Sequence, residues 1–251
     1  GARPIGVTDC LNFGSPENPE VMWQFAQVIQ GMRDACTALH VPVVSGNVSF
    51  YNETDGIPVY PRPTIGMVGL IEKVDRVVTP WFKASGDVVA MLGRTREELG
   101  GSEYLKWVHG LTRGTPPWID LKVEQAGQLC CLEAIDRQLL ASAHDVSDGG
   151  LAVALAECCI GNPERPLGVR LETREMIRGD ASLFSESQSR IVVSLKEENI
   201  DRLKEIAVKH NVPVQVIGEV GGTRFVIQPL MQLPVDELKS IWSGALAAKL
   251  K

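Results

Sequence analysis

The apolar positions in the first third of the chain follow two different spacings. Continuous apolar runs at residues 5–8, 41–44 and 64–71 predict three buried strands. Between the first two runs, apolar side chains recur every three or four residues, which predicts a helix with one apolar face: Val21, Phe25, Val28, Met32, Cys36 and Leu39. A strand–helix–strand order with apolar strands predicts a sheet that helices cover.

The pattern breaks at residues 74–85, and we interpret this break as a change of domain. Beyond it, short apolar runs predict strands at residues 88–92, 142–144, 191–195, 212–217 and 224–227. Amphipathic spacing predicts helices at residues 120–140, after Ser147, from about residue 200, and at 236–250. The predicted fold class is α/β (α+β), with domains at residues 1–78 and 79–251.

The first residues are typical of the end of a helix rather than of the start of a domain. Gly followed closely by Pro often marks a helix end, and Gly1 and Pro4 run straight into the first apolar stretch. We therefore expect residue 1 to lie inside a larger domain whose preceding helix is missing. A short native or cloned N-terminus is the alternative.

Composition narrows the class of protein. The 251 residues carry a net charge of −6, which argues against a broad nucleic-acid surface. No apolar run approaches the roughly 20 residues that a membrane helix needs, so we expect no membrane partner. The six cysteines lack C-x-x-C and zinc spacings, which predicts buried, reduced thiols in a cytoplasmic protein. No G-x-C-x-G turn presents a nucleophile, so a glutaminase site in this chain is not expected.

Two polar stretches follow the first two predicted strands, at residues 8–14 and 45–53. We predict that both are loops leaving the same end of one sheet, where ligands bind in many α/β proteins. Asp9 and Asn47 offer hard oxygens that suit Mg²⁺. Gly46 lets a ligand approach the backbone closely. The alternative is that the asparagines only stabilise turns.

A third polar stretch precedes a predicted helix at residues 143–151. We predict Ser147 as the N-cap, with Gly149 and Gly150 exposing backbone amides to an anion. Asp145 and Asp148 would interact well with the helix N-terminus, and this capping explains them about as well as a functional role does. A fourth stretch contains Glu186, Ser187 and Gln188 and could hold a polar ligand or form a polar turn.

Together the four stretches resemble a known enzyme family. In chain order they read T-D-C-L-N-F-G-S-P-E-N-P-E, V-S-G-N-V-S-F-Y-N-E, A-H-D-V-S-D-G-G-L and L-F-S-E-S-Q-S-R. This combination resembles phosphoribosylformylglycinamidine (FGAM) synthase, and the chain is similar to the second half of its synthetase subunit. D-x-S-D-G-G alone would indicate only the wider superfamily, which includes aminoimidazole ribonucleotide (AIR) synthetase, selenophosphate synthetase and thiamine-monophosphate kinase.

The resemblance implies a fold and a reaction. The fold is a truncated AIR synthase-type N-terminal domain, whose strands join a shared barrel, followed by an AIR synthase C-terminal-type α+β domain. The reaction is a C–N ligase step of purine biosynthesis, in which ATP phosphorylates the amide oxygen of formylglycinamide ribonucleotide (FGAR). Ammonia then displaces phosphate to give the amidine. Such phosphoryl transfer depends on positioning and on charge neutralisation by Mg²⁺.

The resemblance also implies roles for individual residues. Asp9 and Gly46 resemble ATP contacts, Asn47 resembles a Mg²⁺ ligand, and Ser49 resembles a substrate contact. The family's catalytic histidines, ATP-binding lysine and remaining metal carboxylates belong to the first half, so we expect no catalytic residue here. A second, pseudo-symmetric site of structural character is implied for Asp145, Asp148, Gly149, Gly150, Glu186, Ser187 and Gln188.

The implied partners are the first half of the same polypeptide, a glutaminase subunit or domain that supplies ammonia, and a small accessory subunit. The small multi-subunit form and the large fused form of the enzyme both fit the sequence. In the superfamily two N-terminal domains pair across the active site. Without that partner we expect the chain to form a homodimer or to be unstable at that face, and to be inactive alone.

Two other interpretations stay open. The chain could belong to another ATP-using member of the superfamily, although T-D-C-L-N-F-G and G-N-V-S-F-Y-N-E argue against this. It could also be a non-catalytic module that binds a nucleotide or supports assembly.

Overall fold

The computed structural model describes residues 1–172 and 177–250. The chain forms two compact units, Ala2–Val74 and Asp75–Lys251, the second of which includes Gly1. The boundary that the sequence places between residues 78 and 79 stays a prediction.

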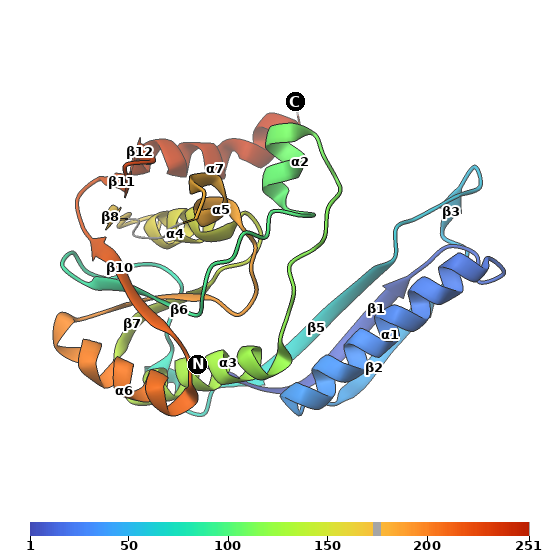
Figure 1. Cartoon of the computed structure of the whole chain (residues 1–251), viewed down its shortest axis with the longest axis horizontal. Coiled ribbons are helices and arrows are strands. Elements are labelled where there is room, and N and C mark those ends of the chain that lie inside the picture. The colour runs from blue at the N-terminus through green and yellow to red at the C-terminus, as the bar shows by residue number, and fades with distance from the viewer. Residues whose placement is uncertain (173–176, 251) are drawn as a thin grey trace. The chain divides into compact units, whose positions relative to one another are not determined.

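The unit Ala2–Val74 is a three-stranded sheet with one long helix lying along it (Figure 1). Its elements are β1 (Arg3–Asn12), α1 (Pro19–Leu39), β2 (Val43–Ser49), β3 (Glu53–Thr54), β4 (Ile57–Pro58) and β5 (Arg62–Leu70), with the 3₁₀ turn η1 (Val74–Arg76) after them. The middle strand β1 is parallel to β2 and antiparallel to β5, while β3 and β4 form a separate hairpin. β2 is therefore an edge strand.

Helix α1 has clear start and stop signals. The Asn18 side chain accepts a hydrogen bond from the Glu20 backbone N–H at 2.9 Å, and Pro19 occupies the first helical turn. The helix ends at His40, whose left-handed φ of 55° suits a C-terminal cap. The apolar face of α1 packs on one face of the sheet around a small core of Leu11, Phe13 and Val21.

The prediction that the strands of this unit are buried is wrong for β2 and β5. Val43 is 49% exposed and Val44 is 70% exposed, and every residue of β5 is exposed. The physical reason is that a single helix covers part of one sheet face, while the other face has no covering element within the unit.

The prediction that the first two polar stretches are loops is also wrong. β1 continues through Asp9 to Asn12, and β2 continues from Ser45 to Ser49. Most polar side chains here, including those of Thr8, Ser45 and Asn47, lie on one face of the continuing strands instead of marking a strand end. The candidate residues are therefore held by a hydrogen-bonded sheet.

The unit Asp75–Lys251 is built on a seven-stranded mixed sheet in the order β12-β11-β8-β10-β6-β9-β7. Its strands are β6 (Val88–Leu92), β7 (Leu140–Asp145), β8 (Val169–Glu172), β9 (Ile191–Leu195), β10 (Val214–Val220), β11 (Arg224–Gln228) and β12 (Met231–Pro234). Its helices are α2 (Glu103–His109), α3 (Leu121–Asp136), α4 (Gly150–Ile160), α5 (Gly179–Phe184), α6 (Ile200–His210) and α7 (Val235–Lys249), with the 3₁₀ turn η2 (Glu197–Asn199). The predicted bounds of β6 and β9 are confirmed, whereas the sequence analysis did not predict β8 and β12.

Helices cover the two faces of this sheet unequally (Figure 1). One face packs along most of its width on α4, α5 and α7, with Val169, Val192 and Phe225 among the buried side chains. The other face packs on α3 and α6 mainly through β6, β7 and β9, with Val214 at the start of β10. The same face of β8, of β11 and of the rest of β10 lies outside both core clusters.

The cysteine prediction is confirmed for the two vicinal pairs. All six thiols are free, and Cys130, Cys131, Cys158 and Cys159 are buried. Burial raises the pKa of Cys130 to about 11 and that of Cys131 to about 12, so these thiols stay protonated and unreactive. Within residues 1–172 and 177–250, no helix has the length and apolar character needed to cross a membrane.

Candidate functional site

The four candidate residues of the first unit lie on opposite faces of its sheet. Asp9 pairs with Gly46, while the next residue along β1, Cys10, pairs with Asn47. Successive side chains of a strand alternate between faces, so Asp9 and Gly46 share one face and Asn47 and Ser49 share the other. Asp9 lies on the face toward α1, because it lines a hollow together with residues of that helix.

Asp9 and Gly46 form a packed pair. A Cβ built on Gly46 would lie 2.4 Å from Asp9 Oδ1, so the space that the glycine leaves is filled by the Asp9 carboxylate. This differs from the expectation that Gly46 makes room for a ligand. Gly46 instead determines where the Asp9 carboxylate lies.

The hollow beside Asp9 has a volume of about 720 Å³, within the usual range for small-molecule sites. Its polar lining comes from Asp9, Arg33, Thr37 and His40 and its apolar lining includes Ile29 and Met32. Sequence reasoning missed Arg33, Thr37 and His40. The signal was present, because Arg33 and Thr37 are four residues apart and so share one side of the predicted helix.

The opposite face of the sheet carries small polar side chains. The Ser45 hydroxyl donates a hydrogen bond to Thr8 Oγ1 at 2.8 Å, and Asn12 and Asn47 lie on the same face by strand pairing. Ser49 follows at the end of β2, and its carbonyl accepts a hydrogen bond from the Asn52 side-chain amide at 2.8 Å. This face is an exposed row of hydroxyl and amide groups.

These residues fit Mg²⁺ poorly on their own. Mg²⁺ in proteins is usually bound through one or two carboxylates. Asn47 offers a neutral oxygen, while Asp9 lies across the sheet. No group of three or more His, Cys, Asp or Glu side chains with metal-site geometry occurs in the part of the chain that the structure describes.

In the second unit, the structure corrects the expected start of helix α4. Gly149, not Ser147, is the N-cap, and it has a left-handed φ of 79°. Its backbone N–H donates to Glu186 Oε1 at 2.8 Å, and the same oxygen accepts from the Glu103 N–H at 2.9 Å. The carboxylate of Glu186 therefore lies at the amino ends of α4 and α2, where an external anion was expected.

Glycine is required at position 150 for a separate structural reason. Its φ is +71°, and an added Cβ would lie 2.6 Å from the Ser185 carbonyl oxygen and 2.8 Å from that of Leu183. No other residue type fits this close approach without moving the backbone. Both glycines of the D-x-S-D-G-G stretch are thus required by packing within the chain.

The loop that contains Glu186, Ser187 and Gln188 is tied down by internal hydrogen bonds. Ser187 Oγ accepts from the Arg96 N–H at 3.1 Å. The Arg190 guanidinium is 2% exposed and donates to the carbonyl oxygens of Ser185 and Ser187 at 2.5 and 2.9 Å, and to Thr95 Oγ1 at 3.1 Å. Only Gln188 remains exposed, and its amide donates to the Glu186 carbonyl.

Asp145 and Asp148 are exposed near this loop. His144 Nδ1 lies 3.5 Å from Asp145 Oδ1, and its Nε2 lies 3.3 Å from Glu157 Oε2. The interaction with the Asp145 side chain raises the pKa of His144, against the opposing effect of burial, and lowers the pKa of Asp145. The structure thus brings Gly149, Gly150 and Glu186 together and leaves the two aspartates outside that contact.

Comparison with protein-family profiles identifies both parts of the chain. The profile described as AIR synthase related protein, C-terminal domain, matches residues 84–228, and the N-terminal domain profile matches residues 1–71. The chain belongs to the AIR synthase related family. The expected fold class, an AIR synthase-type N-terminal domain followed by the α+β C-terminal domain, is confirmed.

Within this family, the whole chain is similar to a synthetase subunit. It is 48% identical to phosphoribosylformylglycinamidine synthase subunit PurL of Anaeromyxobacter dehalogenans over 100% of its own length. The identity to PurL of Caldanaerobacter subterraneus is 45% over 98% of the chain. The chain spans 34% of the length of each of these relatives.

Solved structures agree on the fold of this family member. Thermotoga maritima PurL in complex with FGAR superposes with a TM-score of 0.75 at 23% identity. The superposition covers 95% of this chain and 40% of the Thermotoga maritima chain. E. coli HypE, a hydrogenase maturation protein, superposes with a TM-score of 0.64 at 14% identity, over 93% of this chain and 73% of HypE. The fold is therefore shared with a protein of a different name.

Proposed function

We propose that the chain is the second half of an ATP-dependent FGAM synthase, a C–N ligase of purine biosynthesis. The observation that carries this proposal is its 48% identity to a PurL subunit along its full length. In the proposed reaction, ATP phosphorylates the FGAR amide oxygen and ammonia derived from glutamine displaces phosphate, giving FGAM, ADP and phosphate. Thermotoga maritima PurL structures with ATP and with FGAR support both ligands.

The two sheet faces give the proposed roles a geometry. Asp9 and Gly46 would contact ATP from the face toward α1, and Ser49 would contact FGAR from the opposite face. β2 is an edge strand of the sheet, so ligands on the two faces can meet around its free edge. Asn47 would contribute one oxygen to a Mg²⁺ ion that neutralises phosphate charge when bound. The carboxylate ligands would come from another part of the enzyme.

The proposed assembly follows from this incomplete site. The first half of the longer polypeptide would supply the catalytic groups, and a glutaminase with a small accessory subunit would supply ammonia. The enzyme would work in the cytoplasm, and the chain alone would be inactive. The open sheet face of the first unit would favour self-association of the chain. The loop of Asp145, Asp148 and Gln188 would be a structural counterpart of the active site, since Glu186 already occupies its anion position.

Reconstitution tests this proposal. The chain is mixed with the first half of a PurL relative, and FGAM formation is measured with ammonia, ATP, Mg²⁺ and FGAR. We expect no turnover by the chain alone and turnover by the mixture. Ser49→Ala should raise KM for FGAR, while Asp9→Asn should raise KM for ATP. Thr64→Ala, on the same open face as Ser49, is the matched control and should change neither value.

Turnover by the chain alone would disprove the proposed division of labour. A second candidate is a non-catalytic nucleotide-binding or assembly module, which fits the absence, among the described residues, of any group of three or more His, Cys, Asp or Glu side chains that could hold a metal ion. Thermal shift with ATP and Mg²⁺ separates the candidates when the mixture is inactive. Binding without turnover by the mixture would favour that module.

A further inference from the structure

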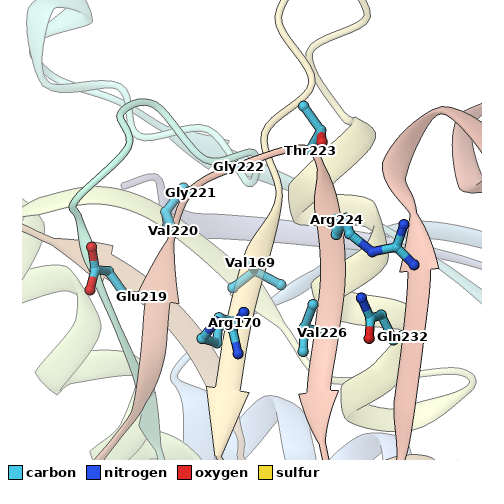
Figure 2. A pocket seen from close by; sticks show the side chains of 10 residues that line it. All are labelled: Val169, Arg170, Glu219, Val220, Gly221, Gly222, Thr223, Arg224, Val226 and Gln232. Atoms are coloured by element: carbon cyan, nitrogen blue, oxygen red, sulfur yellow. The ribbon is translucent and has the colours of Figure 1, made fainter.

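The half of the second sheet that α3 and α6 leave uncovered contains a hollow of about 460 Å³ (Figure 2). We call it the arginine hollow and define it by Arg170 on β8, Arg224 on β11, Gln232 on β12, and Gly222 and Thr223 in the turn between β10 and β11. Its floor includes Val226. None of the proposed roles above uses these residues.

The two arginines face the hollow because of strand register. Their neighbours Val169 and Phe225 are paired with each other and are buried in the core on the opposite face. Side chains one position along each strand must point the other way. Arg170 and Arg224 are therefore both exposed on the uncovered face, on adjacent strands.

Arg224 is positioned by a neutral partner. With the Gln232 amide oriented so that its oxygen faces the guanidinium, that oxygen accepts from Arg224 Nε at 2.6 Å and from Nη2 at 3.3 Å. This contact orients the arginine without neutralising its charge, and Nη1 remains available. Neither Arg170 nor Arg224 forms an ion pair with a carboxylate within residues 1–172 and 177–250.

The turn at one end of the hollow is fixed against the start of β8. Gly168 N–H donates to the Gly222 carbonyl at 2.9 Å, and Gly221 N–H donates to the Gly168 carbonyl at 2.8 Å. A Cβ on Gly168 would lie 2.5 Å from the Arg224 carbonyl oxygen, so the strands approach too closely for any side chain there. The base of Arg224 is consequently held on rigid backbone.

The other end of the hollow is acidic. Glu219 is the register partner of Arg170 on β10, and its carboxylate points away from the two guanidinium groups in Figure 2. A second hollow of about 410 Å³ shares Arg170 and Glu219 and is also lined by Glu172 and Glu197. A ligand that spans both ends needs an anionic group at the arginines and hydrogen-bond donors toward Glu219.

We propose that the arginine hollow binds the phosphomonoester of a small polyol. Two guanidinium groups on adjacent strands offer forked donors that match the oxygens of a phosphate. Polyol hydroxyls would donate to Glu219, and the carbon chain would rest on Val226. A volume of about 460 Å³ exceeds what a bare phosphate fills and lies in the range of small-molecule sites.

Calorimetric titration of the chain tests the proposal with four probes at matched ionic strength: glycerol 3-phosphate, inorganic phosphate, malonate and chloride. We expect glycerol 3-phosphate to bind more tightly than inorganic phosphate, and malonate to bind weakly. Arg170→Gln or Arg224→Gln should weaken glycerol 3-phosphate binding roughly 10- to 100-fold, because each removes a charge-assisted contact. Arg202→Gln removes an exposed arginine of α6 and should leave affinity unchanged.

Two further variants sharpen the specificity. Arg224→Lys keeps the charge but removes the fork, and should also weaken binding. Glu219→Gln should strengthen inorganic phosphate binding while reducing the preference for glycerol 3-phosphate. The proposal would be overturned if Arg170→Gln and Arg224→Gln bound glycerol 3-phosphate as tightly as the wild-type chain does. It would also be overturned if neither phosphate probe showed saturable binding to the wild-type chain. Circular dichroism confirms that each variant is folded before titration.

Discussion

The two units of the chain bury their apolar side chains to very different extents. In the unit Ala2–Val74 a single helix covers part of one sheet face, and only five apolar side chains are buried: Val7, Leu11, Phe13, Val21 and Val41. In the unit Asp75–Lys251 a seven-stranded sheet is packed between helices and contains two extensive core clusters. The first unit holds the candidate ATP and substrate residues, while the second holds most of the buried apolar side chains.

This difference shows how the candidate site is organised. A sheet with one largely exposed polar face offers side chains to a partner or a ligand, and it cannot support itself by burial alone. In the second unit, by contrast, the polar loop at residues 185–190 is bonded within the chain, through the hydrogen bonds of Glu186 and Arg190. Polarity marks a possible site only where the polar groups remain unpaired.

Separating the two units should produce the largest effect. We expect a polypeptide of residues 75–251 to unfold in a single cooperative transition, because both of its core clusters are complete. A polypeptide of residues 2–74 should show no cooperative transition, because its core is too small to offset chain entropy. Thermal unfolding followed by circular dichroism measures both. A cooperative transition in residues 2–74 would show that the open sheet is self-sufficient.

Replacing Arg190 with Met should cause the next largest effect. The change removes the hydrogen bonds to Ser185, Ser187 and Thr95 and leaves buried carbonyl oxygens without donors. We expect the free energy of unfolding to fall by about 3 kcal/mol, measured by urea denaturation. Arg202→Gln is the control for loss of an arginine and should stay within about 0.5 kcal/mol of wild type. Equal stability of the two variants would contradict a structural role for Arg190.

Glu186 should be less costly to replace. Glu186→Ala leaves the N–H groups of Gly149 and Glu103 without their acceptor, for an expected loss of about 1–2 kcal/mol. Glu186→Gln retains an acceptor oxygen and should recover part of that loss. Gln188→Ala changes an exposed neighbour and should have little effect. If added ATP restored the stability of Glu186→Ala, the loop would instead be a nucleotide site.

The smallest expected effect is a pH dependence from His144. Its pKa is raised in the folded chain by Asp145 and Glu157, so its contribution is present below the unfolded pKa and is lost as pH rises through the folded value. Wild type should exceed His144→Gln in stability by more at about pH 5.5 than at about pH 8.5. The difference should be below about 1 kcal/mol, because the two carboxylates are partly solvated. An NMR titration giving an ordinary pKa would contradict this.

Continuous apolar runs predicted the fold well. β6 and β9 have the bounds expected from sequence because both of their faces are buried, and such strands are apolar throughout. β8 was missed because Arg170 and Glu172 alternate with buried residues in a strand of only four residues. Short strands with one polar face resemble loops in sequence.

The alternation of polar and apolar side chains along a strand also explains which features of the site the sequence could predict. Asp9, Asn47 and Ser49 were identified from residue type and resemblance, but their polarity was taken to mark loops. The division between the two faces depends on strand register, including the shift between Val7 and Thr8, which no local pattern specifies. The contact of Glu186 with Gly149 joins residues 37 positions apart and likewise requires the fold.

The order of strands in the large sheet has a consequence for synthesis. β6 lies between β10 and β9, so its nearest neighbours in the sheet come from residues 214–220 and 191–195. When β6 leaves the ribosome, the strand that completes its pairing has not yet been made. At about 5–20 residues per second, roughly 6–26 seconds pass before β10 is available. During that interval the apolar strand β6 lacks at least one of its two neighbouring strands, so the nascent chain should bind a chaperone that recognises extended apolar segments.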